Sequence, residues 1–289
     1  MRTATVGGPN HPVPSRVYAD PVALGEGLGA LILEDLAPAA QEGRPYLLGC
    51  PGGRSPMSTY QAMGRFAAAA SVDLSPLVIV MMDEYVFPAG AGFVNCPADA
   101  HYSCHRAADE EIAGVLNAGL DSARQVRPEN VWFPDPARPA TYDEQIRAAG
   151  GIDLFIIATG AGDGHVAFNP PGTPADSPTR IIRIADTTRT DNLRTFPDFA
   201  GLEDVPAYGV GVGLGTISGL SRRVVLIAHG EDKQYAVRRL AQCDGFGPQW
   251  PASLLYLCRS PQVMLDEAAA GGLPVSPPSP PQPSPRLDV

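Results

Sequence analysis

Lysine is almost missing from this sequence of 289 residues. Of its 21 basic residues only Lys233 is a lysine, and the other 20 are arginines. An arginine bias of this size reflects codon usage, so a lysine that persists against it stands out. Its compact ammonium group offers three hydrogen-bond donors. Composition alone leaves two interpretations open, a functional Lys233 or one that survives by chance on a helix surface.

Long apolar runs are also missing. No stretch of 18 apolar residues occurs, so a membrane-spanning helix is not expected. The first ten residues lack the apolar core of a signal peptide, and we therefore expect a cytoplasmic protein. The five cysteines, an odd number at irregular spacing, indicate reduced thiols rather than a disulfide framework.

Positive charge is scarce too. The net charge of −10 argues against general nucleic-acid binding, because no basic surface field would hold phosphates. A local cationic pocket for a single phosphate is still compatible with it.

What the sequence does contain is a series of short apolar segments that alternate with helical patterns. This alternation predicts an α/β fold, a mostly parallel sheet with helices on both faces, in a single domain over residues 19–270. Residues 1–18 are expected to form an extended arm, 88–104 a long loop, and the proline-rich residues 271–289 a disordered tail. Strands are expected at residues 46–50, 77–82, 152–158, 179–184 and 223–228.

Polar or glycine-rich segments follow four of these strands. Because the carboxyl ends of parallel strands lie along one edge of a sheet, the four segments are expected to converge on a small-molecule site. They are Gly52–Ser55, Asp83–Tyr85, Gly160–His165 and His229–Lys233.

Each segment has a functional and a structural interpretation. The turn Gly52-Gly53-Arg54-Ser55 opens a helix, so its N–H groups suit an anion, or Ser55 simply caps a helix that starts at Pro56. Asp83, at the end of an apolar strand, is a candidate general base or a capping carboxylate. Asp163 and His165 are a candidate acid–base pair, although a histidine bonded to loop backbone is a common alternative.

A metal site is not expected. Cys96, His101, Cys104 and His105 match no familiar zinc spacing, and they lie in a region predicted as a loop that leads into a helix.

Taken in order, these motifs resemble the glucosamine-6-phosphate deaminase/6-phosphogluconolactonase family over roughly residues 20 to 265. The segments that carry the resemblance are Met82-Asp-Glu-Tyr-Val86, Gly162-Asp-Gly-His-Val-Ala-Phe-Asn169 and Gly209-Val-Gly-Val-Gly213. The resemblance implies an open, Rossmann-like α/β sheet and activity on sugar 6-phosphates without an organic cofactor or catalytic metal. It allows monomers as well as homo-oligomers.

The resemblance also implies roles for individual residues. His165 opens the sugar ring with the help of Asp163, and Asp83 moves a proton between C1 and C2. The phosphate is held by the turn Gly52–Ser55, by Arg194 and by Lys233. The single lysine of the sequence thus falls on a phosphate-binding position, which favours the functional interpretation of it.

Two features depart from the deaminase pattern. Deaminases usually carry a glutamate directly after Phe-Asn, where this sequence has Pro170, and the turn Gly53-Arg54-Ser55-Pro56 is more like that of the lactonases. The expected function is an aldose–ketose isomerase, with or without deamination, that acts on a hexosamine 6-phosphate or a related sugar phosphate. The alternatives are a lactonase of a phosphorylated sugar and an inactive relative that only binds sugar phosphates.

Overall fold

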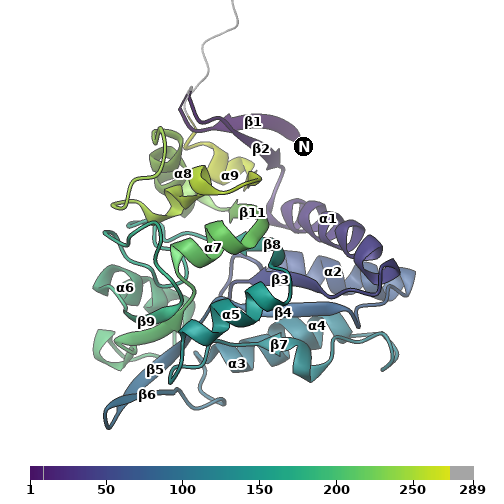
Figure 1. The fold of residues 1–289 in the computed structure, drawn as a ribbon. Coiled ribbons are helices and arrows are strands. Elements are labelled where there is room, and N and C mark those ends of the chain that lie inside the picture. The colour runs from purple at the N-terminus through teal and green to yellow at the C-terminus, as the bar shows by residue number, and fades with distance from the viewer. Residues whose placement is uncertain (9, 274–289) are drawn as a thin grey trace, which may run out of the picture.

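The larger of two sheets forms the centre of the molecule (Figure 1). The computed structural model describes residues 1–8 and 10–273. This sheet has eight strands, and all of its neighbouring strands run parallel except the edge pair β1–β2. In spatial order the strands are β1 (Arg2–Val6), β2 (Val13–Tyr18), β12 (Pro261–Asp266), β11 (Ser221–Ala228), β8 (Ile152–Ile157), β3 (Tyr46–Cys50), β4 (Leu77–Met81) and β7 (Val131–Trp132).

Helices cover both faces of this sheet, as the alternating pattern predicted. On one face α1 (Pro21–Gln41) and α2 (Met57–Ala70) pack together, and the apolar side chains that α1 repeats every four residues are fully buried there. The other face is covered by α5 (Ala140–Ala148), α7 (Leu214–Leu220) and α8 (Gln234–Ala241). Because both faces are covered, β3 and β4 are buried along their whole length, which explains their uninterrupted apolar sequences.

A second, antiparallel sheet lies beside the first, and the sequence did not reveal it. Its spatial order is β6 (Gly92–Asn95), β5 (Asp83–Ala89), β10 (Tyr208–Gly211) and β9 (Arg180–Arg183). Strand β5 follows β4 with only Met82 between them. The N–H of Met82 donates to Cys50 O in the large sheet, and its carbonyl accepts from Val212 N at 2.9 Å next to the small sheet. The chain therefore passes from one sheet to the other at a single residue.

The structure corrects several local predictions. Residues 1–18 are extended, but they pair in the large sheet as β1 and β2 and do not form a free arm. The predicted loop 88–104 contains the hairpin of β5 and β6. Helix α2 begins at Met57 without a side-chain cap, so Ser55 is not its N-cap. The predicted tail lies outside the described residues from 274 onward.

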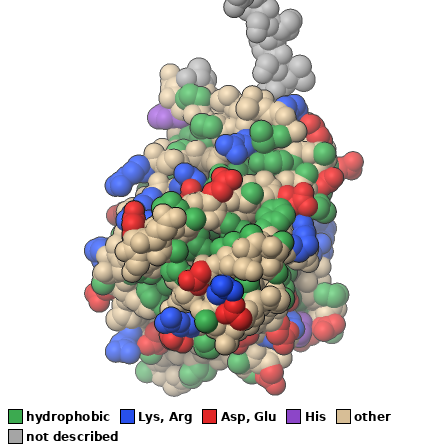
Figure 2. Space-filling view, turned by 90° about the vertical axis from the view of Figure 1, so that its right-hand side faces the viewer, with side chains coloured by type: hydrophobic (Ala, Val, Ile, Leu, Met, Phe, Trp, Pro, Cys, Tyr) green, Lys and Arg blue, Asp and Glu red, His purple; other side chains and the backbone are tan. Residues whose placement is uncertain are grey.

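The surface mixes charges of both signs. Figure 2 shows acidic and basic side chains interspersed with hydrophobic ones on one face of the molecule. Exposed ion pairs of the molecule include Arg2–Glu267 and Arg65–Glu26, each at 3.0 Å. Within residues 1–8 and 10–273, no helix is long and apolar enough to cross a membrane.

Candidate active site

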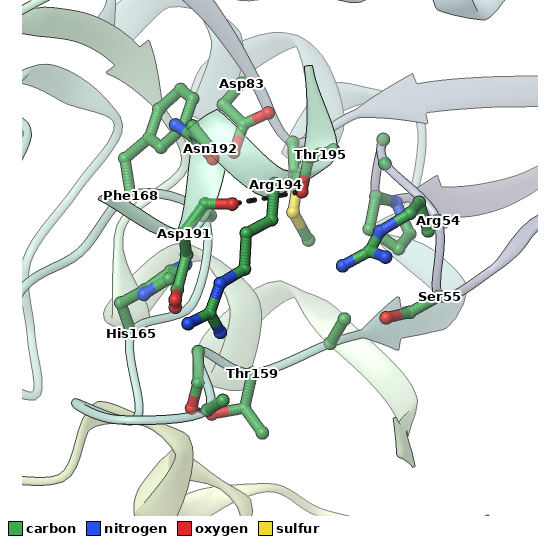
Figure 3. A pocket seen from close by; sticks show the side chains of 18 of the residues that line it. Arg54, Ser55, Asp83, Thr159, His165, Phe168, Asp191, Asn192, Arg194 and Thr195 are labelled. Carbon is green, nitrogen blue, oxygen red and sulfur yellow. Dashed lines mark hydrogen bonds between the residues drawn. The ribbon is translucent and has the colours of Figure 1, made fainter. Parts of the chain in front are cut away.

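The four strand-end segments do converge, on a cavity of about 440 Å³ at the carboxyl edge of the large sheet. Its wall includes parts of the segments that follow β3, β4, β8 and β11. Helix α6 (Asp186–Thr195) closes another side (Figure 3). Of the predicted site residues, the ones that line the cavity are Gly52, Gly53, Arg54, Ser55, Asp83, His165, Arg194 and Lys233, whereas Asp163 lies behind His165.

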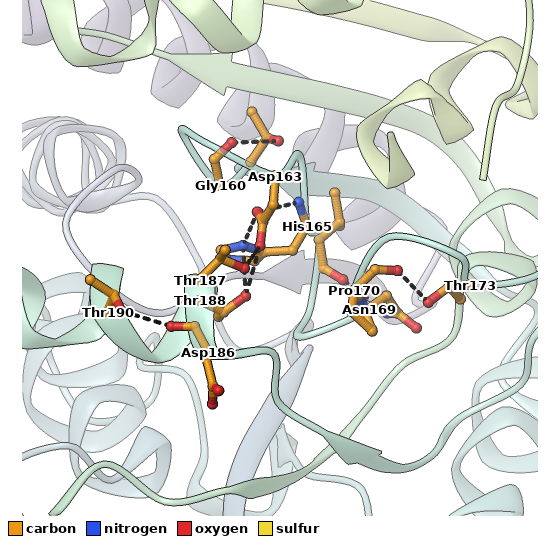
Figure 4. A network of polar contacts seen from close by, with 12 residues as sticks. Gly160, Asp163, His165, Asn169, Pro170, Thr173, Asp186, Thr187, Thr188 and Thr190 are labelled. Atoms are coloured by element: carbon orange, nitrogen blue, oxygen red, sulfur yellow. Dashed lines mark hydrogen bonds and ion pairs between the residues drawn. The ribbon is translucent and has the colours of Figure 1, made fainter. Parts of the chain in front are cut away.

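The imidazole of His165 is held by Asp163 and by the first turn of α6 (Figure 4). Nδ1 of His165 lies 2.7 Å from Asp163 Oδ1, and the hydroxyls of Thr187 and Thr188 donate to Asp163 Oδ2 at 2.5 and 3.2 Å. Because a carboxylate only accepts hydrogen bonds, Nδ1 carries the proton, and Nε2 is left as an acceptor that faces the cavity. Gly160 is required for this arrangement, since a Cβ atom there would lie 2.2 Å from His165 Nδ1.

Asp163 stays ionised in this network. Burial raises the pKa of Asp163, but the hydrogen bonds from the ring and the N–H of His165 and from the Thr187 hydroxyl outweigh it and hold the pKa well below its usual range. A permanently charged carboxylate fixes the orientation and tautomer of the imidazole. The competing interpretation, a histidine bonded only to loop backbone, does not describe this side chain.

The loop after His165 is held by an unusual set of contacts. Ala167 and Phe168 both have left-handed backbone conformations, with φ angles of 50° and 61°. The buried amide of Asn169 donates to the carbonyls of Val166, Ala167 and Val212, and its oxygen accepts from Arg180 at 2.8 Å. These bonds stabilise the strained turn.

Pro170 follows this turn and adds no ionisable group to the site. Its carbonyl accepts from the hydroxyl and the N–H of Thr173 (Figure 4). Support for His165 therefore comes from Asp163 and from the threonines of α6.

Asp83 lies where the two sheets meet, and its side chain faces the cavity. The residue is 7% exposed. Burial raises the pKa of Asp83 to about 7, and the negative charge of Glu84 adds to the effect. The thiol of Cys104 donates to Asp83 Oδ1 at 3.7 Å. A carboxylate that titrates near neutral pH both takes up and returns a proton readily.

Glu84 points the opposite way and is fully buried. Burial raises its pKa, but hydrogen bonds from the His105 ring and from the N–H groups of Cys104, His105 and Tyr85 lower it below the ordinary value. The His105 contact is 2.6 Å. Through these hydrogen bonds Glu84 fixes the segment 103–105 against β5, so its role is structural.

The residues considered for a metal site do not act together. His101 packs edge-on against Phe199 with ring centroids 4.6 Å apart, whereas the thiols of Cys96 and Cys104 donate to the carboxylates of Glu84 and Asp83. In the described part of the chain, no three His, Cys, Asp or Glu side chains are grouped for a metal ion.

The predicted phosphate ligands line one cavity. Arg54 and Ser55 come from the turn after β3, Arg194 from α6, and Lys233 from the segment after β11. Nζ of Lys233 donates to Thr159 O at 2.9 Å, and burial lowers the pKa of Lys233. Cationic donors in the wall of one cavity suit a phosphate group.

Several residues of the cavity wall had no role assigned from the sequence. Tyr85 belongs to a segment that was expected at the site, and its hydroxyl accepts from Asn192 at 2.7 Å. His229 lies 3.2 Å from Ser55 O and links two strand ends. Asp191 and Asn192 belong to α6, whose sequence has no apolar periodicity, so only the neighbouring Arg194 could be assigned, by resemblance.

The sequence matches the model of the family described as glucosamine-6-phosphate isomerases/6-phosphogluconolactonase over residues 19–264. It is 36% identical over 233 residues to the glucosamine-6-phosphate deaminase of Rhodococcus jostii (strain RHA1), which covers 79% of this chain and 82% of the relative. It is 34% identical over 236 residues to the enzyme of the same name from Bifidobacterium longum subsp. infantis, covering 78% of this chain and 82% of the relative.

Solved structures share the fold. A monomeric glucosamine-6-phosphate deaminase superposes with a TM-score of 0.74 at 23% identity and covers 89% of this chain and 98% of its own. The 6-phosphogluconolactonase from Trypanosoma cruzi gives 0.63 at 17% identity, covering 89% and 95%. At these identities the likeness concerns the α/β architecture.

Proposed function

Since this chain belongs to the glucosamine-6-phosphate isomerase/6-phosphogluconolactonase family, we propose that it is an aldose–ketose isomerase that deaminates a hexosamine 6-phosphate. The family resemblance recognised over residues 20 to 265 is confirmed by the match to residues 19–264. The similarity to relatives named glucosamine-6-phosphate deaminase supports the choice within the family. The observation that carries the proposal is one cavity lined by Asp83, His165 and the cations Arg54, Arg194 and Lys233.

The proposed reaction begins at the ring oxygen. The phosphate binds Gly52, Gly53, Arg54, Ser55, Arg194 and Lys233, which leaves the C1 end of the sugar toward His165 and Asp83. Nε2 of His165 accepts the proton of the C1 hydroxyl and passes a proton to the ring oxygen, so the C1–O5 bond breaks and the aldehyde forms. The imidazolium that arises in between is stabilised by the charged Asp163.

Proton transfer between carbons follows. Asp83 removes the proton from C2 while the ammonium group of the sugar passes a proton to O1, which gives a neutral enolamine. Asp83 then returns its proton to C1, which gives a C2 iminium. Water adds to C2 and ammonia leaves, so the products are a ketose 6-phosphate and ammonia. The pKa of about 7 suits Asp83 to both halves of this transfer.

The test is a coupled assay on purified protein with glucosamine 6-phosphate, in which ammonia and ketose phosphate are measured in parallel. We expect the two products in equal amounts, and deuterium placed at C2 should appear in part at C1. Asp83→Asn should abolish both products. If a panel of sugar 6-phosphates yields neither ammonia nor ketose phosphate, the proposal fails.

A lactonase is the second candidate, favoured by the observation that Pro170 leaves the loop after His165 without a further carboxylate. Nε2 of His165 would then activate water for attack on the carbonyl of a 6-phosphosugar lactone, and no C1–C2 transfer would be needed. Lactone hydrolysis that survives in Asp83→Asn but is lost in His165→Ala supports this candidate. Stabilisation of the protein by sugar phosphates without turnover of any substrate supports a binding protein instead.

A further inference from the structure

Asp191 is an acidic side chain in the wall of the cavity that holds the predicted phosphate ligands. It lines the same cavity as Arg54, Arg194 and Lys233. In Figure 3 its carboxylate lies between the labelled side chains of His165 and Arg194. A carboxylate there weakens the attraction of the cavity for a phosphate, so binding of the phosphate alone does not account for it.

The position of Asp191 follows from the periodicity of α6. Residues three or four apart share a face of a helix, and Thr188, Asp191 and Arg194 are spaced in this way. Thr188 contacts His165 Nδ1 at 3.0 Å, whereas Arg194 is one of the proposed phosphate ligands. Asp191 therefore lies about one helical turn from each, between a residue that contacts His165 and a proposed phosphate ligand.

Within the described residues, the carboxylate of Asp191 accepts no hydrogen bond and forms no ion pair. The hydrogen bond drawn at Asp191 in Figure 3 goes to its backbone carbonyl, which accepts from the hydroxyl of Thr195. Two nearby carboxylates have such contacts, since Asp163 accepts from His165 and two threonines and Asp186 pairs with Arg189 at 2.9 Å. Asp232 also lines the cavity, and its charge, like that of Asp191, opposes the lowering of the pKa of Lys233 by burial. An ionised carboxylate accepts hydrogen bonds and cannot donate them, so a ligand must bring the donors.

We propose that Asp191 is a specificity-determining residue whose carboxylate accepts hydrogen bonds from hydroxyl groups of the sugar chain between the phosphate and C1. The inference rests on the proposed function, because it assumes a phosphate at Arg194 and Lys233 and a reacting carbon near His165. Asp191 selects for a polyhydroxylated phosphate ester over inorganic phosphate. It attracts the hydroxyl-bearing chain and repels a bare anion.

The repulsion of a bare anion and the attraction of hydroxyl groups change ligand affinity in opposite directions, so the test compares two ligands. Binding of inorganic phosphate and of an inert hexitol 6-phosphate, which has hydroxyls but no carbonyl, is measured by calorimetry in the wild type and in Asp191→Asn. We expect the variant to bind inorganic phosphate several-fold more tightly, because a negative charge beside the cations is gone. It should bind the hexitol phosphate about tenfold more weakly, because hydrogen bonds to a charged acceptor are lost.

Other outcomes overturn the inference. If both ligands bind more tightly to Asp191→Asn, Asp191 is only a counter-ion, and if both bind more weakly, it only supports the structure. The matched control is Asp186→Asn on the same helix, an exposed carboxylate that should leave both affinities within about twofold. A wild type that binds neither ligand overturns the proposed sugar-phosphate cavity itself, whereas equal affinities of wild type and Asp191→Asn overturn only the role of Asp191.

Discussion

Neutralising Asp83 should stabilise the protein while it abolishes the proposed proton transfer. Burial raises the pKa of Asp83 from 3.8 to about 7, so over this range the folded protein holds a proton that the unfolded chain has released. Stability is then lost as the pH rises from about 4 to 7. The pKa of Asp83 differs by roughly three units between the folded and unfolded states. At about 1.36 kcal/mol per unit, the free energy of unfolding is lowered by about 4 kcal/mol at alkaline pH.

Asp83→Asn removes this penalty, because the amide stays neutral at every pH. Its advantage in free energy of unfolding should be about 2 kcal/mol at pH 5.5, rise to about 4 kcal/mol at pH 8, and stay level above that. Urea titrations followed by the fluorescence of Trp132 and Trp250 at several pH values measure it. The activity of the wild type that depends on ionised Asp83 should rise with pH around the pKa of about 7.

The neighbouring carboxylate provides a control of opposite sign. The pKa of Glu84 is lowered by its hydrogen bonds, so Glu84→Gln loses contacts of the charged form and should be less stable than the wild type at neutral pH. Destabilisation of Asp83→Asn at pH 8, or an advantage that does not change with pH, would refute the reasoning about the burial of Asp83.

Three further outcomes are expected. Lys233→Met should raise KM by about 10- to 100-fold through the loss of a charged hydrogen-bond donor. The control is Arg238→Met, a change at an exposed residue that should leave KM unchanged. Similar KM values in both variants would contradict the role of Lys233. Thr188→Val removes hydrogen bonds to Asp163 and His165, so kcat should fall about tenfold with little change in KM; a change in KM alone would argue against a positioning role. Asn169→Ala removes the hydrogen-bond donor of three buried carbonyls, so the free energy of unfolding should fall by about 3 kcal/mol in urea titrations. A loss below about 1 kcal/mol would show that the turn is stable without Asn169.

The sequence predicted four neighbouring strands of the large sheet, β11, β8, β3 and β4, and missed the other four. Parallel strands that are buried on both faces need apolar sequences, and β3, β4 and residues 154–157 of β8 have them. Turns at their carboxyl ends then fall on one edge of the sheet whatever their separation along the chain. The convergence of Ser55, Asp83 and His165 could therefore be inferred without a structure.

The small sheet and α6 could not be predicted in this way. Strand β10 reads Tyr-Gly-Val-Gly, which has little strand character until it pairs with β5 and β9. Helix α6 buries only Thr188 among its ten residues, so no apolar periodicity marks it. It forms part of the cavity wall, and its polar side chains are the ones that sequence patterns could not interpret, Asp191 among them.

The passage from β4 to β5 at Met82 has a consequence for the identity of the acid in the cavity. Side chains alternate between the two faces of a strand, so Asp83 and Glu84 point in opposite directions, one to the cavity and one into the core. A shift of one residue in β5 would exchange them. The number of residues between Leu77 and Met82 thus decides whether an aspartate or a glutamate meets the ligand. Loss of a single residue from β4 would place the longer glutamate side chain in the cavity, although the sequence of β5 itself is unchanged.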